Sequence, residues 1–419
     1  MVPCPRRRSR RHGQGASQRP TNGRCDRLRR GPRSAPLITS PFTPEHDRLR
    51  AALRRFVEEE LAPHADEWEQ LGRFPDEVFR RMGSLGFLGL TVPEDYGGQG
   101  RDYWSTVVLA EELARSGNGG VAMAIIVHTD MAPTPIVRFG TEQQKRDYLE
   151  PAVRGTRIAC LGITEPEAGS DVAGIRTRAV RGRDGWVING SKTFITNGVR
   201  ADFCTMAVRT SGSPADGHDG LSLFLVDTDL PGYHVTRELD KLGMRSSDTA
   251  ELHLEDVHVP ERALLGAEGQ GFQQIMWELQ GERLLAAVQA VATAQLTFER
   301  TVEHVRARDA RERSRGGSDA RRHRLVDVAT AIEACRRLVY DCADRWNRGV
   351  DATLEIAMCK LASARTSQQV AQEALSLHAD DGGLEGSPIE RAWRDARLLR
   401  IAGGTDEVQR EIIARSMGL

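Results

Sequence analysis

Residues 160–171 read CLGITEPEAGSD, and this stretch decides how the rest of the chain is interpreted. Small residues in such a loop let backbone N–H groups approach a ligand closely, and Thr164 and Ser170 add hydroxyl groups. The same composition also occurs in ordinary surface turns. The loop alone therefore leaves a cofactor site and a plain turn as equal alternatives.

The residues before this loop predict a helical domain over residues 41–155. Thr43 is a candidate helix N-cap and Pro44 suits the first helical position. The apolar residues that follow recur at helical spacing. A second helix is expected at residues 75–85 and should stop at Gly86.

The residues after the loop predict a β domain over residues 156–266. Its expected strands are runs of apolar and β-branched residues at 201–208, 221–227 and 250–259. Asn189-Gly190-Ser191 is expected to form the turn of a hairpin, because Asn-Gly is a strong signal for a two-residue turn. We therefore expect a small antiparallel barrel or sandwich. No G-x-G-x-x-G follows a strand, so a Rossmann dinucleotide site is not supported.

Helical periodicity returns over residues 267–419 and predicts a bundle of long helices. One apolar stripe is formed by Phe272, Ile275, Met276 and Leu279. Glu282 continues this stripe, and Arg283 follows it. A carboxylate on a core-facing stripe is costly unless it is paired or used, so a structural Glu–Arg pair and a functional acid are both open. Gly403-Gly404 in the last helix predicts a kink or a close backbone approach.

Composition excludes several classes of partner. The net charge is −1 and the pI is about 6.9, so we expect neither bulk nucleic-acid binding nor membrane attraction. No apolar run reaches the roughly 18 residues of a membrane helix. Seven cysteines lie scattered without metal-ligand spacing, which is typical of a reduced, cytoplasmic protein without a metal site.

The first 34 residues hold eleven arginines and one acid, Asp26. Almost no large apolar residue occurs there, so we expect a disordered tail over residues 1–40. Three interpretations remain open: a transit peptide, a nucleic-acid-binding arm, or a start codon assigned too far upstream.

The order of these elements resembles the acyl-CoA dehydrogenase family over residues 43–419. Four stretches carry the resemblance: TEPEAGSD, GWVINGSKTFITNG, LGMRSSDTAELHLEDVHVP and RDARLLRIAGGTDEVQREIIAR. The resemblance implies an α+β protein with an N-terminal helical domain, a central antiparallel β-barrel domain and a C-terminal four-helix bundle. It also implies FAD between the β domain and the C-terminal helices, and a homotetramer or homodimer.

The resemblance assigns residues to the cofactor and to the substrate. The cofactor-binding set is Leu161, Ile163, Thr164, Gly169, Ser170, Phe194, Ile195, Thr196, Arg308, Thr405 and Glu407. The substrate-binding set is Ser170, Ser247, Arg283, Gly403 and Gly404. In this assignment Thr164 bonds an edge of the flavin ring, Phe194 stacks on the ring, and Thr196 bonds flavin N5.

The family's reaction removes the α-proton of an acyl-CoA thioester while the β-hydride passes to flavin N5, giving a trans-2-enoyl-CoA. It needs a carboxylate base in a dry pocket that raises the pKa. Most members place that Glu directly before the Gly-Thr of the C-terminal segment, where this chain has Gly403. A minority resembling long-chain and isovaleryl-CoA dehydrogenases place it before an Arg on the earlier helix. Here that residue is Glu282, and the Gly403 N–H would polarise the thioester carbonyl.

One end of the resemblance is altered. Arg308 keeps the arginine of the family's R-x-x-F-G motif, which reaches a neighbouring subunit's FAD. Departures from the family pattern fall at Arg311, Glu312, Asp319, Ser376, Ala379 and Asp380. An added acid near a pyrophosphate is electrostatically unfavourable, so we expect a changed adenosine end of the FAD site.

Three alternatives to an ordinary acyl-CoA dehydrogenase stay open. The thioester could be an acyl group on a carrier protein in a biosynthetic pathway. The chain could be a non-catalytic homologue with impaired FAD binding. Flavin monooxygenases share the fold but need no base, so Glu282 argues against that activity. Electron-transferring flavoprotein is the family's usual electron acceptor, and oxygen is a variant.

Overall fold

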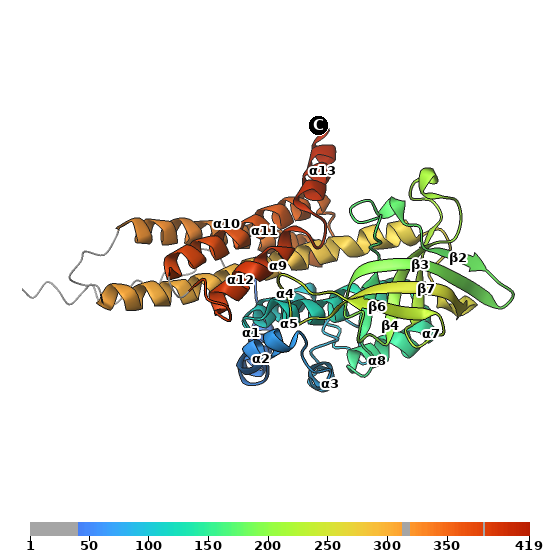
Figure 1. Ribbon diagram of the computed structural model, residues 1–419, viewed down its shortest axis with the longest axis horizontal. Helices are drawn as coiled ribbons and strands as arrows, with labels where there is room; N and C mark the ends of the chain where they lie inside the picture. Colours follow the sequence, from blue (N-terminus) through green and yellow to red (C-terminus); the bar gives the residue numbers. More distant parts are fainter. Residues whose placement is uncertain (1–40, 312–318, 380–381) are drawn as a thin grey trace, which may run out of the picture. The chain divides into compact units, whose positions relative to one another are not determined.

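The first helix, α1 (Pro44–Phe56), begins where the sequence predicts. Thr43 is its N-cap and accepts a hydrogen bond from the His46 N–H, and Pro44 is the first helical residue. The computed structural model describes residues 41–311, 319–379 and 382–419, and Phe42–Leu419 form a unit by themselves (Figure 1). The predictions for the arginine-rich tail, Glu312 and Asp380 lie outside the described residues.

Short helices fill the N-terminal third. After α1 they are α2 (Ala65–Leu71), α3 (Glu77–Ser84), α4 (Tyr103–Ala114), α5 (Gly119–Ile126), α6 (Thr134–Phe139), α7 (Glu142–Gln144) and α8 (Glu150–Val153). Single helical turns join them at Val57–Leu61, Ala62–His64, Glu94–Tyr96, Val127–Met131 and Lys145–Leu149. The expected second helix is α3, and Gly86 follows it with a φ of 76°.

The middle third is a single eight-stranded sheet. Its strands are β1 (Ala159–Gly162), β2 (Arg178–Arg181), β3 (Gly185–Thr196), β4 (Phe203–Arg209), β5 (Leu221–Asp227), β6 (Tyr233–Glu238), β7 (Thr249–Pro260) and β8 (Leu264–Leu265). The strand order is β6-β7-β3-β2-β4-β5-β8, and β1 pairs with β4. Most pairs are antiparallel, as predicted, but β1 and β2 each pair with β4 in parallel.

The hairpin prediction at Asn189-Gly190-Ser191 is wrong. These residues lie inside the continuous strand β3, and the ladder to β7 has an irregularity between Ile188 and Gly190. Gly190 has a φ of 150°, and a Cβ there would come within 2.5 Å of the Thr177 hydroxyl oxygen. The glycine therefore serves close packing of the backbone against Thr177, and not a turn.

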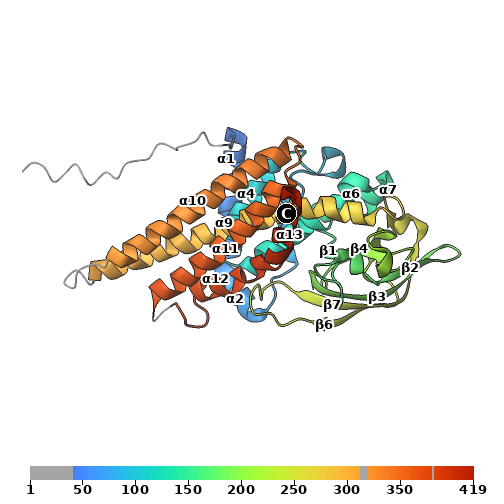
Figure 2. The ribbon, with the colours of Figure 1, turned by 90° about the horizontal axis from the view of Figure 1, so that it is seen from above.

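Long helices form the C-terminal third. They are α9 (Gly271–Arg311), α10 (Asp319–Asn347), α11 (Thr353–His378), α12 (Pro388–Ala396) and α13 (Asp406–Met417). Both views show α9, α10 and α11 side by side, with the sheet near the start of α9 (Figures 1 and 2). The expected single last helix is two helices. Gly403 and Gly404 separate them, with φ of 66° and 89°.

The helices from the two ends of the chain share one hydrophobic core. Leu53 of α1, Val108 of α4 and Ile125 of α5 belong to the same buried cluster as Leu284 of α9 and Ile356 of α11. A second cluster lies within the sheet, and a third joins the sheet to the helices before it and to the start of α9. The third cluster places the loop after β1 near α9.

One helical segment, Gly119–Phe139, is apolar and long enough to cross a membrane by length and composition. It was not predicted from the sequence. The mean hydropathy of its most apolar 18-residue stretch is 1.3, and 83% of that stretch is buried inside the protein. Such burial is what a core helix shows, and Ile125 and Ile126 indeed lie in the core shared by the helices.

Candidate active site

The loop that begins in β1 is fastened by a buried ion pair. Glu165 lies 2.8 Å from Lys192 Nζ, and their side chains are 6% and 0% exposed. The other bonds of this carboxylate come from the backbone N–H groups of Arg176 and Thr177, at 2.7 and 3.0 Å. Burial opposes ionisation of Glu165, but Lys192 and these donors lower its pKa overall. The loop is therefore held rigidly against β3.

Most residues that follow Glu165 in this loop are exposed. The Thr193 N–H donates to the Thr164 carbonyl at 2.9 Å, which places the loop beside the end of β3. Gly169 and Ser170 are exposed, and a Cβ on Gly169 would meet nothing within 4 Å. Packing within the chain does not require a glycine at position 169, so the space over it is free for a ligand.

Phe194 is the clearest sign of a flat ligand. Its side chain is 69% exposed although its neighbour Ile195 is buried in the sheet. Its φ is 58°, and the register to β7 shifts between Lys192 and Ile195. A bulky residue held in the left-handed region with its ring exposed marks a functional position. Ile195, in contrast, can meet a ligand only through its backbone.

Ser247 lies behind the end of β3. Thr249, two residues on, pairs with Thr196 in the β3–β7 ladder. The Ser247 side chain is 2% exposed, and its hydroxyl donates to the Met244 carbonyl at 3.1 Å. The structure thus brings Ser247 and Thr196 to one region, with the Ser247 hydroxyl already occupied.

Glu282 and Gly403 meet although 121 positions separate them. A Cβ built on Gly403 would lie 3.5 Å from Glu282 Oε1, so the Gly403 backbone lies close to the carboxylate. Protein encloses the carboxylate, while part of the side chain remains accessible. Burial raises the pKa of Glu282, against the lowering effects of Arg283 and Lys360. The site thus holds an acid whose proton affinity is increased.

The sequence interpretation missed Glu278. It is 4% exposed, and both of its carboxylate oxygens are buried without a hydrogen-bond partner among the described residues. It lies one turn before Glu282, so the i, i+4 spacing was an available signal. Burial, followed by the negative charge of Glu282, raises the pKa of Glu278 well above its usual range. Of the two carboxyl groups, Glu278 therefore has the more strongly raised pKa.

Lys360 was also missed. It is fully buried on α11, and its ammonium group donates to the Gly404 carbonyl. Burial lowers its pKa to about 8, while Asp406 and Glu282 oppose that shift. A lysine inside the apolar stretch 356–364 was the signal. Lys360 fixes the glycine pair and places a positive charge near Glu282.

Family models of known proteins match most of this chain. Models of the N-terminal, middle and C-terminal domains of acyl-CoA dehydrogenases match residues 43–156, 160–257 and 269–418. The chain belongs to the acyl-CoA dehydrogenase family. Its reaction class is therefore acyl-CoA dehydrogenation, a flavoprotein oxidoreductase activity of fatty-acid metabolism, in a family that uses FAD.

Three relatives illustrate the likeness. The mitochondrial long-chain specific acyl-CoA dehydrogenase of Mus musculus is 37% identical over 376 residues, covering 90% of this chain and 87% of the relative. A crystal structure of a probable acyl-CoA dehydrogenase from Mycobacterium abscessus is 41% identical with a TM-score of 0.86, covering 90% and 99% of the two chains. The FAD complex of PigA is 26% identical with a TM-score of 0.86, covering 91% and 100%.

The residues on the sheet side fit the flavin that this family uses. Phe194 offers an exposed aromatic face. Thr164 lies near it, because its carbonyl accepts the N–H of Thr193, and Gly169 leaves open space.

On α9, Gln280 Oε1 and Arg283 Nε are buried without a partner among the described residues. Unsatisfied buried polar atoms of this kind are expected where a ligand supplies the missing bonds.

The remaining predicted cofactor residues lie elsewhere. Arg308 follows Glu282 by 26 residues on α9, about 39 Å at about 1.5 Å per residue. Thr405 caps α13 by accepting the Val408 N–H, and Glu407 in the first turn pairs with Arg410 at 3.1 Å. The structure therefore does not bring Arg308 to this chain's own Glu282.

Proposed function

We propose that the chain converts an acyl-CoA to its trans-2-enoyl-CoA with FAD as hydride acceptor and Glu282 as the base. The observation that carries this proposal is the Glu282 carboxylate, which protein encloses and which has the Gly403 backbone close to it. Gly403 occupies the position where most family members carry the acid. The similarity to a long-chain enzyme supports a base on the earlier helix, as in the long-chain and isovaleryl types.

Each residue of the site has a distinct task in this proposal. FAD, when bound, supplies the atom that accepts the hydride. Phe194 covers the flavin ring, and the Thr164 and Thr196 hydroxyls orient it. Glu282 takes the α-proton onto a carboxylate oxygen. Because the pKa of Glu278 is raised more strongly, Glu282 is the carboxyl group of the pair that ionises more readily, and nearby Arg283 and Lys360 stabilise it once ionised.

Gly403 would act on the thioester carbonyl. In this structure its backbone lies close to the Glu282 carboxylate. A φ of 66° at a glycine leaves the backbone free to adjust, so that its N–H can meet the carbonyl when substrate binds. Lys360 holds the next carbonyl, at Gly404, and limits that adjustment to one peptide unit.

The proposal extends to the assembly and the acceptor. Arg308 lies too far along α9 to serve its own chain's Glu282 region, which favours a homodimer or homotetramer in which it meets a neighbour's FAD. Electron-transferring flavoprotein is the proposed acceptor, and the cytoplasm the proposed compartment. Sedimentation of the purified protein tests the proposed oligomer, and reoxidation assays with electron-transferring flavoprotein test the proposed acceptor.

The direct test of the activity uses the bound flavin as its reporter. We expect the FAD-loaded protein to lose its visible flavin absorption when an acyl-CoA is added without oxygen. A panel of chain lengths and branched chains identifies the preferred substrate. A protein that binds FAD but is bleached by no acyl-CoA in the panel would contradict the proposal.

We predict that Phe194→Ala weakens FAD binding without unfolding the protein. Loss of the aromatic contact should cost roughly 1–3 kcal/mol, roughly 5- to 150-fold in affinity. The ring is 69% exposed, so little native packing is lost. Flavin fluorescence titration measures the effect. Leu71→Ala is the matched control, because Leu71 is equally exposed elsewhere, and equal FAD affinities in the two variants would count against this role.

We predict an acid limb in the rate of flavin reduction at a pH above the ordinary Glu pKa of 4.5. The base must be deprotonated, and burial raises its pKa, so activity falls as pH drops through the raised value. Lys360→Gln removes a nearby positive charge that lowers this pKa. The limb should then move to higher pH, which stopped-flow measurements across pH would reveal. A limb that stays in place or moves down contradicts this role of Lys360.

A further inference from the structure

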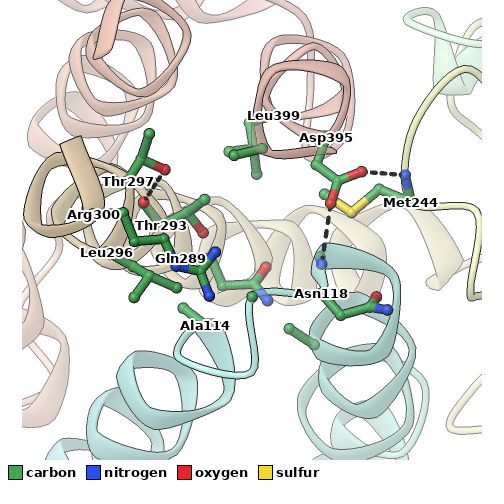
Figure 3. Close-up of a pocket in the computed structure, with 14 residues that line it drawn as sticks. Ala114, Asn118, Met244, Gln289, Thr293, Leu296, Thr297, Arg300, Asp395 and Leu399 are labelled. Atoms are coloured by element: carbon green, nitrogen blue, oxygen red, sulfur yellow. Dashed lines mark hydrogen bonds between the residues drawn. The ribbon is translucent and has the colours of Figure 1, made fainter. Parts of the chain in front are cut away.

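A small cavity lies farther along the face of α9 that carries Glu282. It has a volume of about 30 Å³ and is bounded by α5, α9 and α12 (Figure 3). On this measure one water needs about 10–15 Å³, so the cavity accommodates roughly two waters or one group of a few heavy atoms. It is too small for a chain and suits the terminus of one.

The cavity is in line with the proposed base. Glu282, Ala286, Gln289 and Thr293 are spaced three or four residues apart and so share one face of α9. The Cβ position of Gly403 lies 3.5 Å from Glu282 Oε1 and 3.8 Å from Ala286 Cβ, so Ala286 is the next residue along this face. Thr293 lies about 16 Å beyond Glu282 at about 1.5 Å per residue. This face of α9 therefore leads from the proposed base to the cavity, whose lining on α9 begins at Gln289.

Two polar side chains of the cavity, Gln289 and Arg300, have no partner among the described residues. Gln289 is 4% exposed, and no hydrogen bond is recorded for its amide among the described residues. The Arg300 guanidinium has neither a hydrogen bond nor an ion pair within the described part of the chain, and it lies against Gly117, where a Cβ would come within 2.7 Å of Nη2. Arg300 is partly exposed and both side chains face the cavity, so water is their alternative partner, and a ligand that displaces this water must replace its hydrogen bonds.

Two other polar side chains of the cavity, Asp395 and Thr297, already have partners. The Asp395 carboxylate accepts the N–H groups of Gly119 and Met244, at 3.1 and 2.6 Å, and lies on a different wall from Arg300 (Figure 3). The Thr297 hydroxyl donates to the Thr293 carbonyl at 2.8 Å.

Within the described residues, Arg300 is the unpaired member of a group of three neighbouring arginines. The two arginines near Arg300 are paired, Arg115 with Glu299 at 3.1 Å and Arg391 with Asp66 at 2.7 Å. No acid in the described residues pairs with Arg300 itself. A guanidinium beside an amide donor matches a carboxylate, which can take two N–H bonds at once.

We propose that this cavity binds a carboxylate at the far end of the acyl chain, so that the substrates are ω-carboxyacyl-CoA esters. This inference rests on the proposed function, since it uses Glu282 to fix the position of the α-carbon. A methyl end would displace water from the Gln289 amide and the Arg300 guanidinium without replacing its hydrogen bonds. A carboxylate end satisfies both and brings a negative charge to Arg300.

The test compares acyl-CoA esters of equal chain length that end in a carboxylate, a hydroxyl or a methyl group, using the FAD-loaded full chain. We expect kcat/KM for the carboxylate ester to exceed that for the methyl ester by on the order of 10- to 100-fold at the best length. Arg300→Leu should abolish this preference, because it lowers kcat/KM for the carboxylate ester and raises it for the methyl ester by removing a polar group that a methyl end cannot satisfy. Calorimetric binding of the matched enoyl-CoA products should show the same order.

Controls separate the possible failures. Arg115→Leu removes a neighbouring but paired arginine and should keep the preference. If Arg300→Leu does not fold, Gln289→Leu provides the same comparison. Equal or better turnover of methyl or hydroxyl esters by the unaltered protein would overturn this inference while the dehydrogenase activity stands. Failure of every ester to bleach the flavin would overturn both.

Discussion

Glu282→Gln should lower the rate of flavin reduction by acyl-CoA by about 10²- to 10⁴-fold, the usual contribution of a positioned general base. Glutamine keeps the size of the side chain but cannot take the α-proton. The substitution also removes an acid whose pKa is raised by burial, so the fold should not suffer from losing it. Stopped-flow spectroscopy of the FAD-loaded variant measures the rate, and its flavin spectrum confirms that the cofactor is bound.

The matched control lies on the same helix. Glu303→Gln replaces an exposed glutamate of α9 for which no ion pair is recorded in the described residues, and it should reduce flavin at the unaltered rate. A Glu282→Gln protein that reduces flavin as fast as this control would exclude Glu282 as the base. Glu278→Gln would then become the informative variant, because Glu278 is the other carboxylate of the site.

Glu165→Ala should destabilise the protein by about 3–5 kcal/mol, because it leaves the Lys192 ammonium buried without its partner. Lys192 is fully buried, so water cannot replace the carboxylate. The loop 160–171 would also lose its attachment to the Arg176 and Thr177 N–H groups, so FAD affinity should fall as well. Urea unfolding followed by circular dichroism measures the free energy of unfolding.

The control for this prediction is in the same loop. Glu167 pairs with Arg176 on the surface, where both side chains are 66% exposed, and such pairs contribute about 0–1 kcal/mol. Glu167→Ala should therefore leave stability nearly unchanged. Replacing both members of the buried pair, as Glu165→Leu with Lys192→Met, should cost less than Glu165→Ala alone. Equal stability of Glu165→Ala and Glu167→Ala would show that the buried pair is not the anchor.

Local signals in the sequence were sufficient for the elements that depend on them. Thr43 and Pro44 start α1 because a cap and a first helical proline act within one turn. Apolar runs predicted β5 and most of β4 and β7, since strand pattern depends on residues two positions apart. The hairpin at Asn189-Gly190 failed because a Gly can serve close backbone packing as well as a turn, and the packing partner, Thr177, is distant in sequence.

The sequence by itself thus determined the three-part architecture, the loop at 160–171 and the acid at Glu282, through local pattern and motif. Only the tertiary structure decided which residues surround that acid. Lys360 approaches Glu282 from α11, and Gly403 approaches it from the turn before α13. The Lys192–Glu165 pair attaches the loop to β3. Burial and the approach of charges from distant segments raise or lower a pKa, and neither is encoded in the spacing of neighbouring residues.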